Sequence, residues 1–221
     1  ALRPAAPDFA LMWDNAYCLH EVYGEFVPFR DMLTLCREAG NADMVYEFAS
    51  TSKITFPGAG VAVMAASEAN LKYLSGLLGA QTISYDKVNQ LRHVRFLQDK
   101  AHVLELMQRH AAILRPKFEA VLAALRGIAP LGIASWTEPK GGYFISCDAM
   151  PGTAKRVLAL CAEAGVTMTP AGATYPGGND PADSNIRIAP SFPPVEELEQ
   201  AMTIFCLCIR QAALEKRIRE A

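Results

Sequence analysis

The first part of the chain alternates short apolar runs with one amphipathic segment. Residues 8–13 form an apolar run that ends at the polar Asp14, and residues 44–48 form a second run. Short runs of this kind are typical of buried strands. Between them, residues 31–39 carry apolar side chains at spacings of three and four and are followed by Gly40, which predicts a helix. The order strand, helix, strand predicts a parallel α/β layer.

Beyond the second predicted strand the apolar spacing becomes helical over long stretches. Asp86 is predicted to cap a helix that starts at Lys87 and whose apolar positions continue to Met107. Pro116 is expected to kink this helical arm or to begin its next segment, because proline lacks the N–H group that a helix interior requires. A helix pair of this length predicts a connector between two domains, around residues 86–126.

The remaining part of the chain mixes strand-like and helix-like segments and contains no internal repeat. We predict strands at 132–136 and 142–147, near Val166 and near Ile186, and helices at 153–164 and from Val195 to about Arg219. Strands interleaved with helices predict a second layer of α/β structure after the connector.

The charge balance argues against two classes of partner. The 221 residues carry 21 Lys+Arg against 23 Asp+Glu, which gives a formal net charge of −2. Charges of both signs are interspersed, so the chain lacks the basic face that binds a nucleic-acid backbone. Its longest apolar runs fall far short of the roughly 20 residues needed to cross a bilayer. We therefore expect neither nucleic acid nor membrane among its partners.

The cysteines and histidines show no metal-site spacing. The six cysteines are scattered, and Cys206 and Cys208 lie in an apolar run where thiols act as small hydrophobic groups. No signal peptide heads the sequence. We interpret the cysteines as reduced and expect a cytoplasmic location. The four histidines have no cysteine or carboxylate at ligand spacing, so no metal site is expected.

The most informative segment places Lys53 in a polar turn directly after a predicted strand. Lysine amines that are desolvated, or that lie beside a second cation, lose their proton more easily and serve as Schiff-base nucleophiles. The hydroxyls of Ser50 and Ser52, three residues and one residue earlier, are suited to hydrogen-bond an anion such as a phosphate. Taken alone, the same pattern also describes a solvated loop lysine.

Two further segments fit the same chemistry. Asp14 and Tyr17 follow the first predicted strand, whose end in a parallel sheet meets the same edge as Lys53. The carboxylate is suited to keep a ring nitrogen protonated, and the tyrosine to hydrogen-bond a phenolate oxygen on that ring. Arg187 lies between two isoleucines of a predicted strand and is suited to bidentate capture of a carboxylate. The plainer alternatives are a capping aspartate, a core tyrosine and a solvent-facing arginine.

Four motifs in this order resemble those of a known family. They are D-x-A-Y beginning at Asp14, S-x-S-K ending at Lys53, P-x-G-G-Y-F beginning at Pro139 and N-I-R-I-A beginning at Asn185. The order is similar to that of fold-type I pyridoxal-phosphate enzymes, specifically the aminotransferases of the aspartate aminotransferase group. Residues 56–61 and 84–93 look most like a divergent bacterial branch of that group.

The resemblance implies a role for each residue of the predicted site. Lys53 would form the internal aldimine with pyridoxal 5′-phosphate and move the proton between the substrate Cα and the cofactor. Asp14 would pair with the pyridinium nitrogen and maintain the electron sink, and Tyr17 would hydrogen-bond the phenolate oxygen. Ser50 and Ser52 would hold the phosphate group.

The implied activity is a ping-pong transamination between an amino acid and a 2-oxo acid, with aspartate and 2-oxoglutarate as the substrate pair that the resemblance suggests. Arg187 would bind the substrate α-carboxylate and orient the bond that is broken. A dicarboxylate needs a second cation, and Arg92 or Lys87 are the candidates. Relatives form homodimers with residues of both subunits in each active site, so the resemblance also implies a homodimer.

The resemblance implies an α/β fold of the PLP-dependent transferase type. Residues 1–100 would form the C-terminal part of the large three-layer α/β/α domain, and residues 101–221 a complete small α+β domain. The family places much of its large domain before the position of Asp14, whereas this sequence starts at Ala1. The sequence thus resembles the C-terminal half of an aminotransferase, and we expect its 221 residues alone to be inactive.

The glycine-rich loop departs from the family pattern. Many relatives carry a phosphate-binding arginine where this chain reads Gly-Ala-Gly-Val-Ala at residues 58–62. The phosphate is therefore expected to rely on other groups, such as backbone N–H donors of this loop.

Two other functions share these motifs. A PLP-dependent lyase or decarboxylase would use the same lysine and aspartate and would differ in which Cα bond is held perpendicular to the ring. A non-catalytic aminotransferase-like domain that senses an effector in a bacterial regulator would need a DNA-binding helix-turn-helix in a preceding segment.

Overall fold

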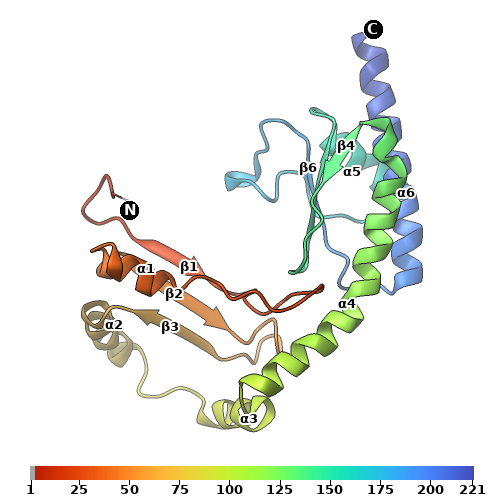
Figure 1. The fold of residues 1–221 in the computed structure, drawn as a ribbon. Helices are drawn as coiled ribbons and strands as arrows, with labels where there is room; N and C mark the ends of the chain where they lie inside the picture. The colour runs from red at the N-terminus through yellow and green to blue at the C-terminus, as the bar shows by residue number, and fades with distance from the viewer. Residues whose placement is uncertain (1–2) are drawn as a thin grey trace. The chain divides into compact units, whose positions relative to one another are not determined.

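The protein is described by a computed structural model that covers residues 3–221 and falls into two compact units (Figure 1). The first unit contains the described residues up to Leu19 together with Glu25–Met107. The second unit contains His20–Gly24 together with Gln108–Ala221. The short segment 20–24 therefore packs with the C-terminal unit, although the first unit flanks it on both sides in the sequence.

The first unit is built on a three-stranded sheet with the order β1-β2-β3. Its strands are Leu11–Asp14 (β1), Val45–Ser50 (β2) and Ala62–Ala66 (β3). β1 and β2 run parallel with helix α1 (Met32–Glu38) between them in sequence, which confirms the predicted strand, helix, strand order. α1 begins after Asp31, whose carboxylate accepts a hydrogen bond of 2.9 Å from the Thr34 N–H.

Two strands of this sheet differ from the sequence prediction. Leu11 and Trp13 of β1 pack against the small cluster around Val45, but Met12 on the opposite face is 73% exposed. Within the described residues β1 is thus half-buried, with one packed face. β3, which pairs antiparallel with β2, was not predicted, since its sequence Ala-Val-Met-Ala-Ala is rich in a residue that strands disfavour.

Three helices follow the sheet of the first unit. They are α2 (Glu68–Gln81), α3 (Lys87–Leu97) and α4 (Lys100–Ile128), which continues into the second unit. Asp86 caps α3 as predicted. The single helical run predicted from Lys87 to Met107 is wrong, because Gln98 adopts a left-handed φ of +55° and the Asp99 side chain accepts a hydrogen bond from the first turn of a new helix.

Pro116 lies inside α4 and does not begin a new helix. An interior proline costs a helix about 3 kcal/mol. The next turns of α4 bury Phe118, Val121, Leu122 and Leu125 in the core of the second unit, each at most 3% exposed. Because burying one such side chain contributes roughly 1.5–3 kcal/mol, the packing outweighs the proline and the helix continues.

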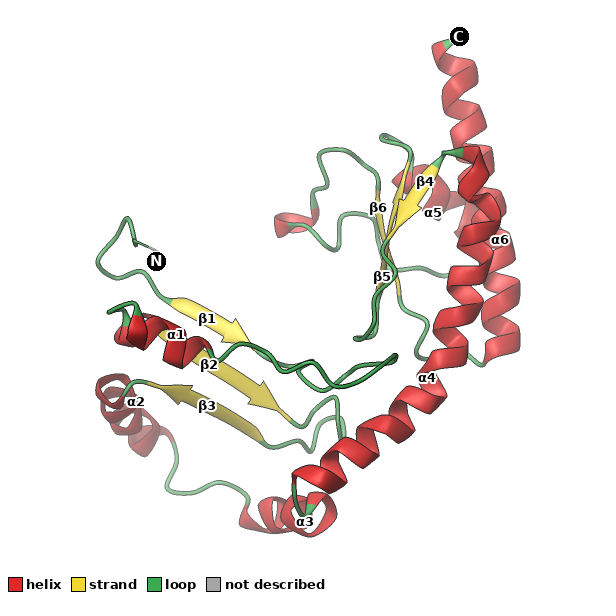
Figure 2. Cartoon of the chain, in the orientation of Figure 1, coloured by secondary structure: helices red, strands yellow, loops and turns green. Residues whose placement is uncertain are grey.

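The second unit contains an antiparallel sheet with the order β4-β5-β6, covered on one face by α4, α5 and α6 (Figure 2). Its elements are β4 (Ala134–Trp136), β5 (Ile145–Ala149), β6 (Asn185–Ile188), α5 (Ala154–Glu163) and α6 (Val195–Glu220). Short 3-10 turns, η1 (Ala42–Met44) in the first unit and η2 (Ala129–Leu131) and η3 (Pro176–Gly178) in the second, complete the chain. Alternate residues of β5 are buried, so one face of the sheet packs on the helices.

The strands and helices predicted for the second unit form, with one exception. No strand forms near Val166 in the described chain. Gly165 adopts φ +84° at the end of α5, and the Val166 N–H then donates to the Cys161 carbonyl at 2.8 Å. This residue therefore closes the helix, with its apolar side chain packed against the core, instead of pairing with a strand.

None of the six cysteines, all of which lie among the described residues, forms a disulfide, and five of them are buried. Burial raises the pKa of the Cys147 and Cys161 thiols to about 12. These side chains thus serve as small core residues, as the apolar run around Cys206 and Cys208 predicted. Among the described residues, no helix combines the length and the apolar character that a bilayer crossing requires.

Candidate active site

Asp14 and Ser50 lie at the same edge of the first sheet. Asp14 is the last residue of β1 and is paired with Phe48 in the parallel register, two residues before β2 ends. The N–H of Asn15 donates to the Phe48 carbonyl at 2.8 Å and fixes the chain as it leaves the strand. Tyr17, half-buried, follows within one turn. The predicted meeting of the two strand ends is present, with the Asp14 side chain exposed.

Lys53 lies in a tight turn that begins where β2 ends. The N–H groups of Ile54 and Thr55 both donate to the Thr51 carbonyl, at 2.9 and 2.8 Å. The Ser50 hydroxyl accepts a hydrogen bond of 3.4 Å from the Ser52 N–H. Lys53 is exposed at the middle of this turn.

The glycine-rich loop packs back against this turn. A Cβ at Gly60 would lie 3.0 Å from the Ser52 hydroxyl oxygen and 3.2 Å from its backbone nitrogen, so this position has no room for a side chain. Thr51 and Val61 are joined by two hydrogen bonds of 2.9 Å, one between backbone groups and one from the Val61 N–H to the Thr51 hydroxyl. The loop is therefore a rigid partner of the lysine turn.

Arg187 belongs to the second unit and lies on β6 opposite Ser146 of β5. Its guanidinium carbon lies 4.6 Å from the centre of the Phe144 ring. Its Nε is buried and has no hydrogen-bond acceptor among the described residues. A buried, unpaired guanidinium nitrogen is costly unless a ligand such as a carboxylate supplies the acceptor.

A buried polar network supports the strand that carries Arg187. The Asp180 carboxylate accepts hydrogen bonds from the N–H groups of Ser184 and Asn185, both at 2.8 Å, which lowers its pKa. The Asn185 side chain donates to the Ser146 hydroxyl at 2.9 Å and to Asp148 at 2.8 Å. Asn185 begins the N-I-R-I-A motif, but the sequence analysis did not predict Asp180 or this network, although the Asn-Asp-Pro signal at 179–181 is typical of an Asx turn.

The P-x-G-G-Y-F motif is held by the segment 20–24 of the same unit. A Cβ at Gly141 would lie 2.6 Å from the His20 carbonyl oxygen, and the Gly142 N–H donates to that oxygen at 2.8 Å. The Arg115 guanidinium donates to the Val22 carbonyl at 3.1 and 3.0 Å. Gly141 is thus needed for close backbone approach, and Gly142 for its positive φ of +80°. The sequence analysis did not predict this contact.

The candidate second cations lie on α3. Arg92 is exposed, and its guanidinium carbon lies 5.0 Å from the centre of the Phe56 ring, three residues beyond Lys53. Lys87 is exposed in the first turn of the helix. The same helix brings Asn89 to the glycine-rich loop and the buried His93 to the lysine turn, and the sequence analysis predicted neither contact.

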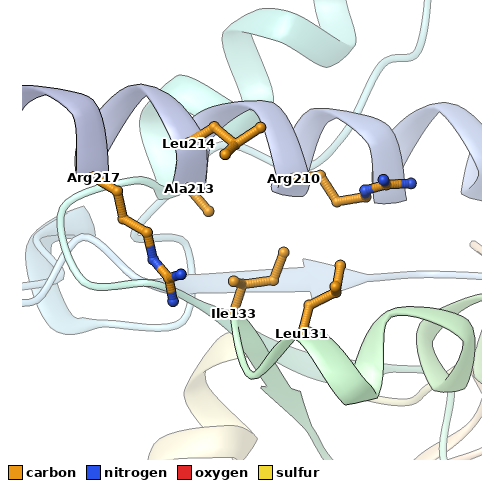
Figure 3. A pocket seen from close by; sticks show the side chains of 6 residues that line it. All are labelled: Leu131, Ile133, Arg210, Ala213, Leu214 and Arg217. Atoms are coloured by element: carbon orange, nitrogen blue, oxygen red, sulfur yellow. The ribbon is translucent and has the colours of Figure 1, made fainter.

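A separate pocket of about 180 Å³ lies in the second unit between η2 and α6 (Figure 3). Leu131 and Ile133 face α6 across it, and the α6 residues that line it are Arg210, Ala213, Leu214 and Arg217. None of the predicted site residues lines this pocket. Its apolar walls are therefore no part of the candidate active site.

Comparison with known proteins gives the chain clear relatives. A family model described as aspartate amino-transferase matches residues 1–221. An aspartate aminotransferase of Corynebacterium glutamicum is 48% identical over 97% of this chain. This chain spans 50% of that relative, so it covers about half the length of the curated relatives it matches.

Solved structures show the same similarity in three dimensions. The crystal structure of an aspartate transaminase from Corynebacterium glutamicum superposes with a TM-score of 0.95 at 48% identity, covering 97% of this chain and 51% of that one. An α-aminoadipate aminotransferase from Thermus thermophilus, solved with N-(5′-phosphopyridoxyl)-L-leucine, has a TM-score of 0.73 at 24% identity, covering 92% and 50%. At this identity, the similarity to the Thermus thermophilus protein shows a shared fold. These matches confirm the resemblance and the mixed α/β fold.

Proposed function

Because the chain belongs to the aspartate aminotransferase family, we propose that it forms part of a pyridoxal-phosphate-dependent enzyme that transfers an amino group from an amino acid to a 2-oxo acid. The observation that carries this proposal is the placement of Lys53 in a tight turn at the sheet edge where Asp14 also ends its strand. An exposed amine and a carboxylate at the end of parallel strands are suited to a cofactor with an aldehyde and a basic ring nitrogen.

The residues at this edge fit pyridoxal phosphate in their chemistry. They offer an amine, a carboxylate, a phenol, two serine hydroxyls and a glycine-rich loop that approaches the turn too closely for a side chain. When bound, the cofactor supplies an aldehyde that captures the amino group and a ring that withdraws electrons from the substrate Cα. The protein must then hold the ring, bind the substrate and move one proton.

In this proposal Lys53 binds the aldehyde and later moves the proton from the substrate Cα, since its exposed amine is the basic group of the turn. Asp14 keeps the ring nitrogen protonated, and Tyr17 hydrogen-bonds the phenolate oxygen. Ser50 and Ser52 donate to the phosphate. The amides of Gly58 and Gly60 have no acceptor among the described residues, which leaves them for the anion in place of the absent arginine.

Arg187 binds the substrate α-carboxylate in this proposal. The support is its buried Nε, which lacks a hydrogen-bond partner among the described residues, and its packing on the Phe144 ring. This packing restricts the orientation of the guanidinium group. Aspartate and 2-oxoglutarate are the proposed substrates. The name of the aspartate aminotransferase of Corynebacterium glutamicum supports aspartate, and 2-oxoglutarate is proposed from the resemblance of the sequence motifs to the family.

The proposal extends to architecture and surroundings. We assign residues 1–100 to the cofactor-binding large domain and residues 101–221 to the small domain, a division supported by the separation into two compact units near residue 107. A homodimer is proposed from the family. The five thiols buried in apolar surroundings support a cytoplasmic location.

The proposal is tested by intact-mass measurement before and after addition of pyridoxal phosphate and borohydride, followed by peptide mapping. We expect one phosphopyridoxyl group, located on Lys53, and its loss in a Lys53→Ala variant. Lys72→Ala, which removes an exposed lysine from α2, serves as the control that keeps the label. No adduct, or adducts spread over surface lysines, would contradict the proposal. Release of a 2-oxo acid without carbon dioxide then separates transamination from decarboxylation.

A further inference from the structure

We propose that Asn89 and His93 of α3 are positioning residues that hold the turn of Lys53 from both sides. The inference rests on the proposed function of Lys53 as the amine that binds the cofactor. It concerns residues of the first unit only, and all contacts that carry it lie within that unit.

His93 hydrogen-bonds the two threonines that flank Lys53. Its Nε2 lies 3.1 Å from the Thr51 hydroxyl and 2.9 Å from the Thr55 hydroxyl. Its Nδ1 lies 2.9 Å from the Asn89 carbonyl oxygen, which accepts only, so Nδ1 carries the proton. The single lone pair of Nε2 in the neutral ring is then shared by the two hydroxyls, and the Thr55 hydroxyl has the Thr51 carbonyl, 3.2 Å away, as a second acceptor. One imidazole thus connects the residues two positions before and two positions after the lysine.

Asn89 holds the other side of the same region. One helical turn before His93, its side-chain amide donates to the Ala59 carbonyl at 2.9 Å, and the Gly60 carbonyl lies 3.5 Å away. These carbonyls belong to the loop that packs against Ser52. Asn89 and His93, at i and i+4 of α3, lie on one helix face. From this face Asn89 hydrogen-bonds the glycine-rich loop and His93 hydrogen-bonds the lysine turn.

The burial of α3 favours this role over simple core packing. His93 is the buried residue of the helix, at 5% exposure, whereas Leu91 and Val94 beside it are 49% and 64% exposed. A helix that packs through its apolar side chains would bury the leucine and the valine instead. Here a polar face is buried. The His93 Nε2 and the Asn89 Nδ2 meet hydroxyls and carbonyls around Lys53, whereas the buried Asn89 Oδ1 has no hydrogen-bond partner among the described residues.

The consequence for Lys53 is a restricted backbone. The turn has few apolar contacts of its own, because Lys53 and Ser52 are exposed. Without the acceptor at His93, Thr51 and Thr55 lose their common partner, and the turn samples more conformations. A lysine that must place its amine on a bound aldehyde gains from a fixed backbone, since orientation contributes strongly to such reactions.

The test uses the full chain and two readouts. Amide hydrogen exchange is measured at Ile54, Thr55 and Val61, whose N–H groups donate to Thr51, and the labelling of Lys53 by pyridoxal phosphate and borohydride is measured against cofactor concentration. His93→Phe keeps the ring shape and removes the acceptor. We expect about tenfold faster exchange at these amides, unchanged exchange in β2, and a several-fold higher cofactor concentration for half-labelling.

Four further variants make the result specific. His93→Gln, which keeps an acceptor, is expected to restore part of both losses. Thr55→Val removes one of the two hydroxyls and keeps His93, so a smaller change of both readouts is expected. If His93→Phe does not fold, this variant tests the inference in its place. The controls are His102→Phe on the exposed start of α4 and Gln90→Leu beside Asn89, which leave both readouts unchanged.

Unchanged exchange and labelling in His93→Phe, or an equal increase of exchange throughout the first unit, would overturn the inference. Failure of the proposed function looks different. In that case the unsubstituted chain carries no label at Lys53, while the exchange of the three amides still reports whether Asn89 and His93 hold the turn.

Discussion

Asp14 lies directly opposite Phe48 in the parallel register of β1 and β2, two residues before β2 ends and its chain enters the lysine turn. The relationship places a carboxylate and an amine at one sheet edge, although 39 residues separate Asp14 from Lys53 in the sequence. A parallel pairing is required for this, because an antiparallel partner would carry its polar end to the opposite edge.

Asp14→Asn is therefore expected to lower kcat about 100-fold, the loss typical when one electrostatic group is removed from an active site. The neutral amide keeps the shape of the side chain and no longer stabilises a proton on the ring nitrogen. Steady-state kinetics with aspartate and 2-oxoglutarate measure the effect in the complete enzyme of which this chain is proposed to form part. Asp8→Asn, in the exposed segment before β1, is the matched control, and an equal loss in both variants would refute the assignment.

Arg187→Lys is expected to raise the KM for the amino acid roughly 10- to 100-fold, because lysine keeps the charge but cannot make a bidentate contact with a carboxylate. Labelling of Lys53 by the cofactor should stay the same. KM is compared with that of Arg217→Lys, which alters an exposed arginine of α6. An unchanged KM in Arg187→Lys would show that the α-carboxylate binds elsewhere.

Leu125→Ala should lower the free energy of unfolding of the second unit by about 3 kcal/mol, the usual cost of a cavity at a fully buried leucine. Urea unfolding is followed by the fluorescence of Trp136 in a Trp13→Phe background, so that the signal comes from the second unit. Leu207→Ala removes a leucine that is 54% exposed and should cost far less. Equal costs would contradict the described core.

The ion pair between α5 and α6 predicts a pH-dependent stability. Arg156 donates to both carboxylate oxygens of Glu215, at 2.7 and 2.9 Å, and thereby lowers the Glu215 pKa from the ordinary 4.5 to about 2. The stabilisation is complete above the unfolded pKa and disappears as the pH falls toward 2. Glu215→Gln should lower Tm by about 1–3 °C at pH 7.

The pH dependence of the Tm difference between Glu215→Gln and the unsubstituted protein is a more specific test of the ion pair. The gap in Tm between the two proteins should stay constant from pH 7 to about pH 5. It should shrink below this, because Glu215 of the unfolded chain, with the ordinary pKa of 4.5, gains a proton that the folded protein binds only near pH 2. Glu199→Gln, on an exposed position of α6, should show no such gap. A gap that widened on acidification would contradict the ion pair.

Local signals were enough to predict most elements. Asp86 caps its helix, and the alternation around Arg187 forms a strand, because both depend on side chains within a few residues of each other. The break at Gln98 was not predictable in this way. A left-handed glutamine has no local signature, and the Asp99 cap that follows it lies within an otherwise continuous apolar period.

The site residues also divide into those with a local sequence signal and those without one. Lys53, Asp14 and Arg187 could be named from motifs, because each motif is short. Asn89 and His93 could not, since their partners at residues 51–60 lie about 30 to 42 positions away and are reached only through the packing of α3. The same holds for His20, whose contact with Gly141 depends on a backbone approach between distant segments.

The alternation along β6 also limits how this protein can change in length. Ile186 and Ile188 are at most 2% exposed, while Arg187 between them points to the other face, over Phe144. Because side chains alternate strictly along a strand, inserting or deleting one residue in β6 would turn the arginine into the apolar core and an isoleucine out of it. Evolution can lengthen the turns before β6 by single residues, but within the strand only changes of two residues preserve the face on which the arginine lies.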